Sequence, residues 1–371
     1  MHPRARHIGL AALLVAAAAA RVLAAPEPQP PAPKAAPAVR ALILASQTVD
    51  PKGPYARNMS DWVRRFVDLL HRRAGLPLAN IRVLAETPDA KAAPAVTTCT
   101  LDNVRAAFDA LRTELTPADQ FVLVILGHGT VTDPVGKLCL VGEDLKATVL
   151  AEWLDKLPTR RIVIVNCASG GAEFLEKYSR PGRVVVSATG NLGEGNQTYF
   201  AEFFLQTYES GRADRNADGV VTVLEAFNEA AHRCINWYHR QYKIPPPKDA
   251  PPGPREVEVR TAEARRLFRK FYDGIADLVM VTPETDEDES TDPPLELADL
   301  QQRREAGEHA SLEDRGENNG TLYWAQNKAY PLDGKRGEQG EIAARTVIGT
   351  PELRPPALPA GPVPSRQVGT D

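Results

Sequence analysis

Two short stretches place catalytic residue types beside glycines, and each follows a run of apolar residues. His128 lies between Gly127 and Gly129 in ILGHGT, and Cys167 follows an Ile- and Val-rich run and Asn166 in RIVIVNCASGG. A thiol becomes a nucleophile when imidazole assists its ionisation, and the same imidazole can later protonate the leaving group. The pair therefore predicts nucleophilic catalysis at Cys167, with His128 as general base and acid.

The backbone around this pair could complete such a site. The glycines beside His128 would let the chain approach a substrate closely, and the amides of Gly129 and Cys167 could stabilise an oxyanion. Each residue also has an ordinary explanation, because a cysteine after a buried strand usually packs in a core and a histidine there often bonds within a turn. Ser169 is a rival nucleophile, but the pattern G-x-S-x-G requires glycine where Cys167 stands, so we expect no serine hydrolase.

The elements that must position these residues alternate between strands and helices. Such alternation predicts an α/β fold with a mostly parallel sheet in a three-layer α/β/α sandwich, with ligands at the carboxyl ends of the strands. The chain beyond Gly190 is expected to be largely helical to about Ile275. We expect strands at 40–46, 80–86, 119–130, 161–166 and 182–190, a short strand or hairpin arm at 137–145, and helices at 59–75, 101–115 and 147–158.

The paired motifs, an apolar run with Gly-His-Gly and an apolar run with x-Cys-x-Ser-Gly, resemble those of legumain and caspase-like cysteine peptidases. The similarity extends over roughly residues 40–240 and is closest to secreted bacterial legumain-like proteins. It implies a caspase-like fold, a peptide or protein substrate, a His128/Cys167 dyad and Gly129 as oxyanion donor. It further implies that Arg57 corresponds to a basic residue of the primary specificity pocket.

The sequence also departs from this family's pattern. Legumains carry an acidic residue and alanine before their cysteine, whereas this chain has Val165 and Asn166. Some bacterial relatives lack the cysteine, and a fold does not guarantee an activity. Two functions therefore follow: a cysteine endopeptidase working through an acyl-enzyme, or a catalytically inactive calcium-binding scaffold or interaction module.

The segment Asp214–Glu225, DRNADGVVTVLE, matches the calcium-loop pattern D-x-[DN]-x-[DN]-G-x5-E. Gly219 would supply the sharp turn, and helical sequence lies on both sides. The alternative is a solvated turn that caps the following helix. We expect this loop to bind calcium in a structural role and not a sensory one, because a single loop lacks the usual paired partner. The predicted ligands are Asp214, Asn216, Asp218, Val220, Thr222 and Glu225.

A second loop, at 187–200, follows the last strand of the predicted sheet. Asn191 and Glu194 could contact substrate there. Capping of the next helix by Asn196 explains part of the same pattern.

The rest of the sequence indicates the compartment of the protein, its charge balance and the limits of its domain. Positive residues, an apolar run and small residues predict a secretory signal peptide at 1–24, so we expect a secreted or periplasmic protein with no stable membrane span after cleavage. Lys and Arg (44) nearly balance Asp and Glu (48), which argues against nucleic-acid binding. We expect a Pro/Ala-rich linker at 25–39, the domain at 40–280, and an acidic, Pro-rich, largely disordered tail at 281–371, in which 320–349 could dock on the domain.

The chain has four cysteines: Cys99, Cys139, Cys167 and Cys234. An even number permits disulfides in an oxidising compartment. If Cys167 is a working thiol, the other three cannot all pair, so the pairing stays open.

Overall fold

The structure is a computed structural model of the 371-residue chain. It describes residues 36–48, 50–130, 135–190, 197–211, 213–216, 218–241, 255–258, 278–281, 308, 310–316, 321–322, 332 and 335–354. The predicted signal peptide and most of the predicted linker lie outside these residues.

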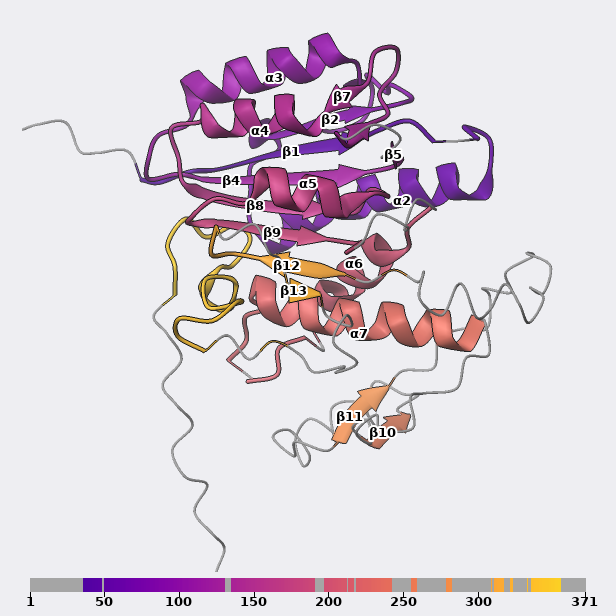
Figure 1. Cartoon of the computed structure of the whole chain (residues 1–371), viewed down its shortest axis with the longest axis vertical. Helices are drawn as coiled ribbons and strands as arrows, with labels where there is room; N and C mark the ends of the chain where they lie inside the picture. Colours follow the sequence, from indigo (N-terminus) through magenta and orange to yellow (C-terminus); the bar gives the residue numbers. More distant parts are fainter. Residues whose placement is uncertain are drawn as a thin grey trace, which may run out of the picture. The chain divides into compact units, whose positions relative to one another are not determined.

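The fold is α/β and is built on a mostly parallel mixed sheet of eight strands (Figure 1). The six strands from β3 to β9 are parallel, and β12 and β13 add antiparallel strands at one edge. The sheet order is β13 (Thr321–Leu322), β12 (Ser311–Glu313), β9 (Arg183–Ser187), β8 (Arg161–Asn166), β4 (Gln120–Leu126), β1 (Val39–Ala45), β2 (Ile81–Ala85) and β3 (Val96–Thr98).

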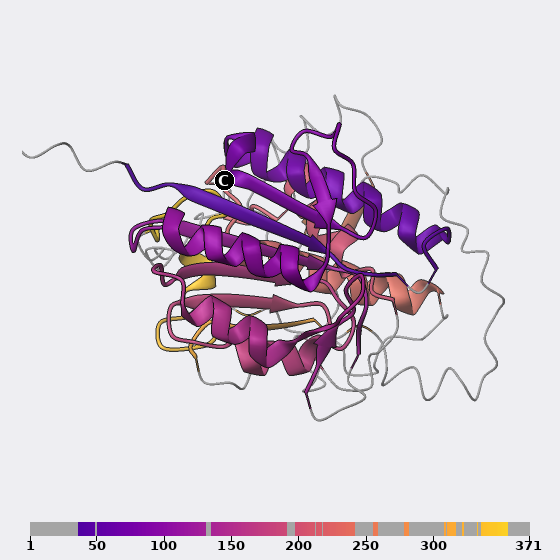
Figure 2. The same ribbon diagram turned by 90° about the horizontal axis from the view of Figure 1, so that it is seen from above.

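Helices pack on both faces of this sheet (Figures 1 and 2). Because strand side chains alternate between faces, Val122 and Val124 of β4 join one apolar core while Phe121 and Leu123 join the other. The first core holds side chains of α2 (Pro54–Asp68), α6 (Phe200–Ser210) and α7 (Val223–Gln241). The second holds those of α3 (Leu101–Glu114), α4 (Ala147–Asp155) and α5 (Gly171–Tyr178).

The helix α2 begins earlier than the sequence pattern indicated. Pro54 lies in its first turn, where a missing amide costs no helical hydrogen bond, and Ser60, close to the expected start, lies inside the helix. The helix continues into a π-helical turn at Leu69–Arg73 and a 3-10 turn follows at Leu78–Asn80. The expected end at Gly75 is confirmed, since this glycine has φ +75°.

Two smaller sheets accompany the main one. The expected hairpin arm forms β6 (Lys137–Leu138) and β7 (Leu145–Lys146), which pair antiparallel with each other, and β6 pairs with β5 (Gly129–Thr130). The segment expected to be helical up to residue 275 instead contains the strand β10 (Arg255–Glu258), paired in parallel with β11 (Leu278–Val281). Prolines at 251, 252 and 254 explain the difference, because proline interrupts a helix.

The boundary expected at residue 280 is wrong, because later segments belong to the domain. Strand β12 extends the main sheet, with Leu312 opposite Val186 of β9. Residues 335–354, here called the C-terminal strap, contain a 3-10 turn at Ala343–Arg345 and pack against α7. The buried Asp314 carboxylate accepts the strap amides of Gly340, Ile342 and Ala343, and the Gln120 side chain of β4 donates to the strap carbonyls of Val347 and Thr350.

The helices that the structure describes include none that is both long and apolar enough to cross a membrane.

Candidate active site

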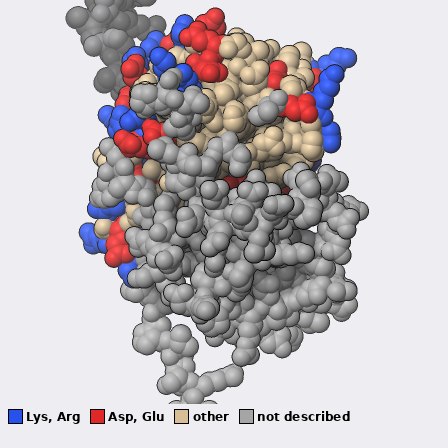
Figure 3. All heavy atoms as spheres, turned by 45° about the vertical axis from the view of Figure 1, so that its right-hand side comes forward, with Lys and Arg blue, Asp and Glu red and all other residues tan. Residues whose placement is uncertain are grey.

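The predicted catalytic residues follow β4 and β8, whose carboxyl ends lie at the same edge of the sheet. Strand β4 lies between β1 and β8, and Ile125 pairs with Asn166. The residues that follow β1 hold those that follow β4, because the His128 amide donates to the Gln47 carbonyl at 3.1 Å. Figure 3 brings this edge forward, and its described surface is mostly uncharged, with acidic and basic side chains around it.

His128 is held by Ser169. The Ser169 hydroxyl lies 3.1 Å from His128 Nδ1, accepts the Gly129 amide at 3.1 Å, and lies 3.0 Å from the Gly129 carbonyl. Burial of the half-buried imidazole lowers the pKa of His128, and Asp144 opposes that shift in part. A neutral imidazole at neutral pH can accept a proton, as a general base must.

Cys167 directly follows β8 and lies in the apolar core between the sheet and the helices α2, α6 and α7. Cys167 is 1% exposed and belongs to the same apolar cluster as Val163 and Val165. This is expected because side chains two residues apart lie on the same face of a strand. Burial raises the pKa of the Cys167 thiol well above its usual range, and the Glu308 carboxylate raises it further. The arrangement therefore keeps this thiol protonated and covered.

The cover over Cys167 comes from the start of α6 and from residue 308. Thr198 donates its hydroxyl to the Cys167 carbonyl. The Glu308 carboxylate accepts the amides of Tyr199 and Phe200, the latter at 2.8 Å, and the hydroxyl of Tyr238. Glu308 thus anchors the first turn of α6 over the exit of β8.

The two amides expected to bind an oxyanion are both bound to protein acceptors. The Cys167 amide donates to the Ile125 carbonyl at 2.8 Å, within the pairing of β4 and β8, and the Gly129 amide donates to Ser169. In this arrangement neither can stabilise a developing oxyanion.

The glycines beside His128 serve close packing within the protein, where we expected clearance for a substrate. Gly127 has φ +109°, and a β-carbon there would collide with the Ser46 hydroxyl. A β-carbon at Gly129 would collide with the Ser169 carbonyl. Both positions therefore require glycine because the β1, β4 and β8 exits converge.

Asn166 shapes the turn that carries these residues. Its Oδ1 accepts the Ala168 amide at 3.1 Å, a local bond typical of asparagine in turns. Gly170 then adopts a left-handed conformation, with φ +68°. Sequence reasoning missed the contact of Ser169 with His128, because this turn, and no periodic pattern, directs Ser169 toward β4.

Of the expected substrate residues, Arg57 is the one that the structure describes. Arg57 is exposed and donates to the Lys52 carbonyl at 2.9 Å, near the start of α2. Asn191 and Glu194 lie outside the described residues. All four cysteines are free thiols.

Side chains of the predicted calcium loop bind backbone amides of the same loop. The Asp214 carboxylate accepts the amides of Asp218 at 3.1 Å and Gly219 at 2.8 Å. Asn216 Oδ1 also accepts the Asp218 amide, at 3.0 Å, and Gly219 has φ +83°. These bonds fold the oxygen-bearing side chains of the loop into one tight turn.

Glu225, the last predicted ligand of the loop, caps a helix. Glu225 Oε2 accepts the amide and the hydroxyl of Thr222, both at 2.9 Å, and Thr222 Oγ1 accepts the Glu225 amide, a reciprocal cap at the start of α7. Burial raises the pKa of Glu225, and the neighbouring carboxylates of Asp214 and Asp218 raise it further.

The donor chemistry of the loop fits a hard cation, since carboxylate and amide oxygens are calcium ligands. Across the described residues, however, no three His, Cys, Asp or Glu side chains are grouped closely enough to hold a metal ion. Asp218 Oδ2 is instead paired with Arg354 of the strap, at 2.8 Å from Nη1. The carboxylates would therefore have to exchange some protein donors for the ion.

Comparisons with known proteins give no family assignment. No family model and no curated protein matches the chain. Among solved structures, the chain is similar to protein GSU0716 from Geobacter sulfurreducens, at 14% identity and a TM-score of 0.36. That match covers 53% of this chain and 89% of that one.

Proposed function

We propose that this protein is a secreted or periplasmic cysteine endopeptidase with a caspase-like, three-layer α/β/α domain. The observation that supports it best is the convergence of His128 with the turn after β8 at the carboxyl edge of the sheet, joined by the bond from Ser169. In open α/β sheets this edge is where ligands bind. The substrate would be a peptide or protein.

The chemistry would run through an acyl-enzyme. His128 would accept the Cys167 proton as the thiolate attacks a peptide carbonyl, and would return that proton to the departing amine. Water would then hydrolyse the thioester and restore both side chains. Because Cys167 is covered, this reaction requires the first turn of α6 to move away from the β8 exit, so the arrangement described here would be latent.

A catalytically inactive, calcium-stabilised scaffold is the second candidate. The burial of Cys167 and the occupation of both expected oxyanion donors favour it. In that case the His128–Ser169 bond would hold the β4 and β8 exits together without chemistry.

One experiment separates the two candidates. The full chain and its Cys167→Ala and His128→Ala variants would be incubated with a peptide library, with Cys139→Ala as the control because Cys139 is a partly exposed thiol outside the proposed dyad. A peptidase loses cleavage in the first two variants and keeps it in the control. Cleavage that survives Cys167→Ala overturns the peptidase proposal, as does a lack of cleavage by both the full chain and a Glu308→Gln chain, in which the anchor of α6 over Cys167 is weakened.

We further propose that Asp214–Glu225 binds calcium in a structural role, with the ligands predicted above. Binding to the folded state alone should stabilise it by about 2.7 kcal/mol when free calcium is 100-fold above the dissociation constant. Thermal melts with and without calcium test this, with Glu225→Gln removing the rise and the exposed Glu338→Gln as control. Equal melting temperatures with and without calcium would overturn the calcium proposal and leave the peptidase proposal standing.

A further inference from the structure

His128 and Cys139 are neighbours across the small sheet that follows β4. Strands β5 and β6 pair antiparallel, with Gly129 opposite Leu138. The next residues along this register are His128 and Cys139, and the Cys139 amide donates to the His128 carbonyl at 3.0 Å. The β-carbons of directly opposite residues lie about 4.5–5.5 Å apart. An imidazole and a thiol, two metal-ligating groups, are therefore brought together here.

Both side chains lie on the face of this small sheet that is turned away from the second apolar core. Leu138 is fully buried in that core, and a β-carbon at Gly129 would contact Phe174 of the same core. Because strand side chains alternate between faces, the next residues, Cys139 and His128, lie on the other face. Both are partly exposed, whereas the other three cysteines of the chain are buried. A solute can therefore reach this pair without any movement of α6.

Ser169 orients the His128 ring so that Nε2 is the available nitrogen. The Ser169 hydroxyl has one proton and donates it to the Gly129 carbonyl at 3.0 Å. It therefore accepts from His128 Nδ1, 3.1 Å away, and this tautomer leaves the lone pair of the ring on Nε2. A metal-ligating imidazole generally donates its other N–H to a neighbouring acceptor in this way, which fixes the ring.

Asp144 adds a negative charge beside the pair. It directly precedes β7, the strand on the other side of β6 from β5. Burial raises the pKa of the Cys139 thiol, Asp144 raises it further, and Lys137 opposes the shift. Burial lowers the pKa of His128, and Asp144 opposes that change. A carboxylate that favours the protonated form of both groups also favours a metal cation in the place of the proton.

The chemistry of the two donors selects the kind of cation. Thiolate and imidazole are ligands of zinc and similar borderline divalent cations, with Zn–S of about 2.3 Å and Zn–N of about 2.0–2.1 Å. We propose that Cys139 Sγ and His128 Nε2 bind a zinc-type divalent cation at the carboxyl edge of the sheet. The thiol proton leaves as the sulfur–metal bond forms, water fills the other coordination positions, and Asp144 supplies compensating charge.

The number of donors sets the strength of this site. It has two protein ligands, in agreement with the described residues holding no group of three metal-ligating side chains. A dedicated zinc site has three or four, so we expect a dissociation constant of roughly micromolar here. The oxygen donors of the loop Asp214–Glu225 suit a hard cation instead, so the two sites should differ in the metal they bind.

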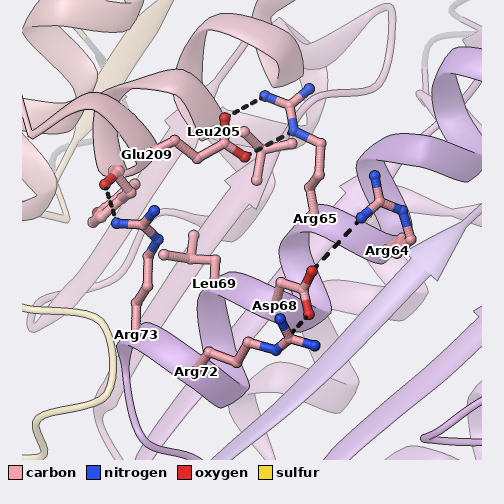
Figure 4. Close-up of a pocket in the computed structure, with 9 residues that line it drawn as sticks. Arg64, Arg65, Asp68, Leu69, Arg72, Arg73, Leu205 and Glu209 are labelled. Carbon is pink, nitrogen blue, oxygen red and sulfur yellow. Dashed lines mark hydrogen bonds and ion pairs between the residues drawn. The ribbon is translucent and has the colours of Figure 1, made fainter. Parts of the chain in front are cut away.

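The cavity of about 560 Å³ between α2, its π-helical turn and α6 is, by contrast, balanced by its own residues (Figure 4). Arg65 pairs with Glu209, and the Asp68 carboxylate is shared between Arg64 and Arg72. The charged groups of this cavity thus already compensate one another.

Cobalt tests the metal site, because a Co²⁺–thiolate bond gives a charge-transfer band in the near ultraviolet. The full chain, kept reduced, should show this band on titration with Co²⁺. Zn²⁺ should remove the band by displacing Co²⁺, whereas excess Ca²⁺ should leave it unchanged. Cys139→Ser should abolish the band, His128→Gln should weaken Co²⁺ binding at least about tenfold, and Asp144→Asn should weaken it roughly tenfold.

The matched control is His71→Gln, because His71 is a partly exposed histidine whose Nδ1 lies 2.8 Å from the Leu76 carbonyl. It should leave the Co²⁺ affinity unchanged. A second measurement needs no variant: Zn²⁺ should protect Cys139 of the wild-type chain from alkylation by iodoacetamide, as read by mass spectrometry.

Four results overturn the proposal. These are no thiolate band with the full chain, a band that survives Cys139→Ser, equal Co²⁺ affinity in the His128→Gln and His71→Gln chains, and alkylation of Cys139 at the same rate with and without Zn²⁺. None of these measurements depends on peptidase activity or on the calcium loop.

Discussion

Ser169→Ala removes the hydroxyl that joins the turn after β8 to His128, which follows β4. Ser169 is fully buried, and its hydroxyl is the acceptor for the Gly129 amide and the partner of His128 Nδ1. Removing it leaves a buried N–H without an acceptor, which costs about 1–3 kcal/mol. We expect the free energy of unfolding to fall by about that amount in urea titrations of the full chain.

The effect should also be visible at the imidazole itself. Loss of the Ser169 hydroxyl should change the ¹⁵N chemical shift of His128 Nδ1, because the tautomer and orientation of a histidine follow from its hydrogen-bond partner. Ser60→Ala is the control, since that hydroxyl bonds only locally to Ala56 within α2, at 2.9 Å. A Ser169→Ala protein as stable as the Ser60→Ala control, with an unchanged imidazole spectrum, would refute the reasoning.

Three further predictions concern other parts of the domain. Arg354→Gln should raise calcium affinity by roughly two- to fivefold, because a cation no longer competes for Asp218; isothermal calorimetry with the exposed Arg336→Gln as control measures this, and unchanged affinity contradicts it. Asp314→Ala should free the strap and speed its proteolysis, since three strap amides lose their acceptor; cleavage at the wild-type rate would show that other contacts hold it. Because the pKa of His128 is lowered in the folded state, its protonation favours unfolding, so stability should fall as pH drops below about 6.5. Urea midpoints between pH 5 and 7 measure this dependence, and His128→Gln should make it shallower. An identical dependence in the variant would exclude His128 as its source.

Much of the fold could be predicted because its signals are local and repeated. After Gln120, strand β4 consists of apolar residues, as expected for a central parallel strand covered on both faces. The Thr100 hydroxyl caps α3 by accepting the Asn103 amide at 3.3 Å, close to the expected helix start. Strand β12 has three residues, too few to show any period, and its pairing with β9 depends on chain more than 100 residues away.

The sequence by itself determined that His128 and Cys167 follow neighbouring strands and leave the sheet at one edge, because parallel strands share their direction. It also indicated the tight turn at Asp214–Gly219, whose bonds join residues at most five positions apart. Only the tertiary structure decided which groups meet His128. The alternation of side chains along β8 sends Cys167 into the core under α6, whereas the left-handed turn at Gly170 lets Ser169 reach the imidazole. Contacts between residues 40 positions apart depend on how the sheet is covered, and no local pattern encodes that cover.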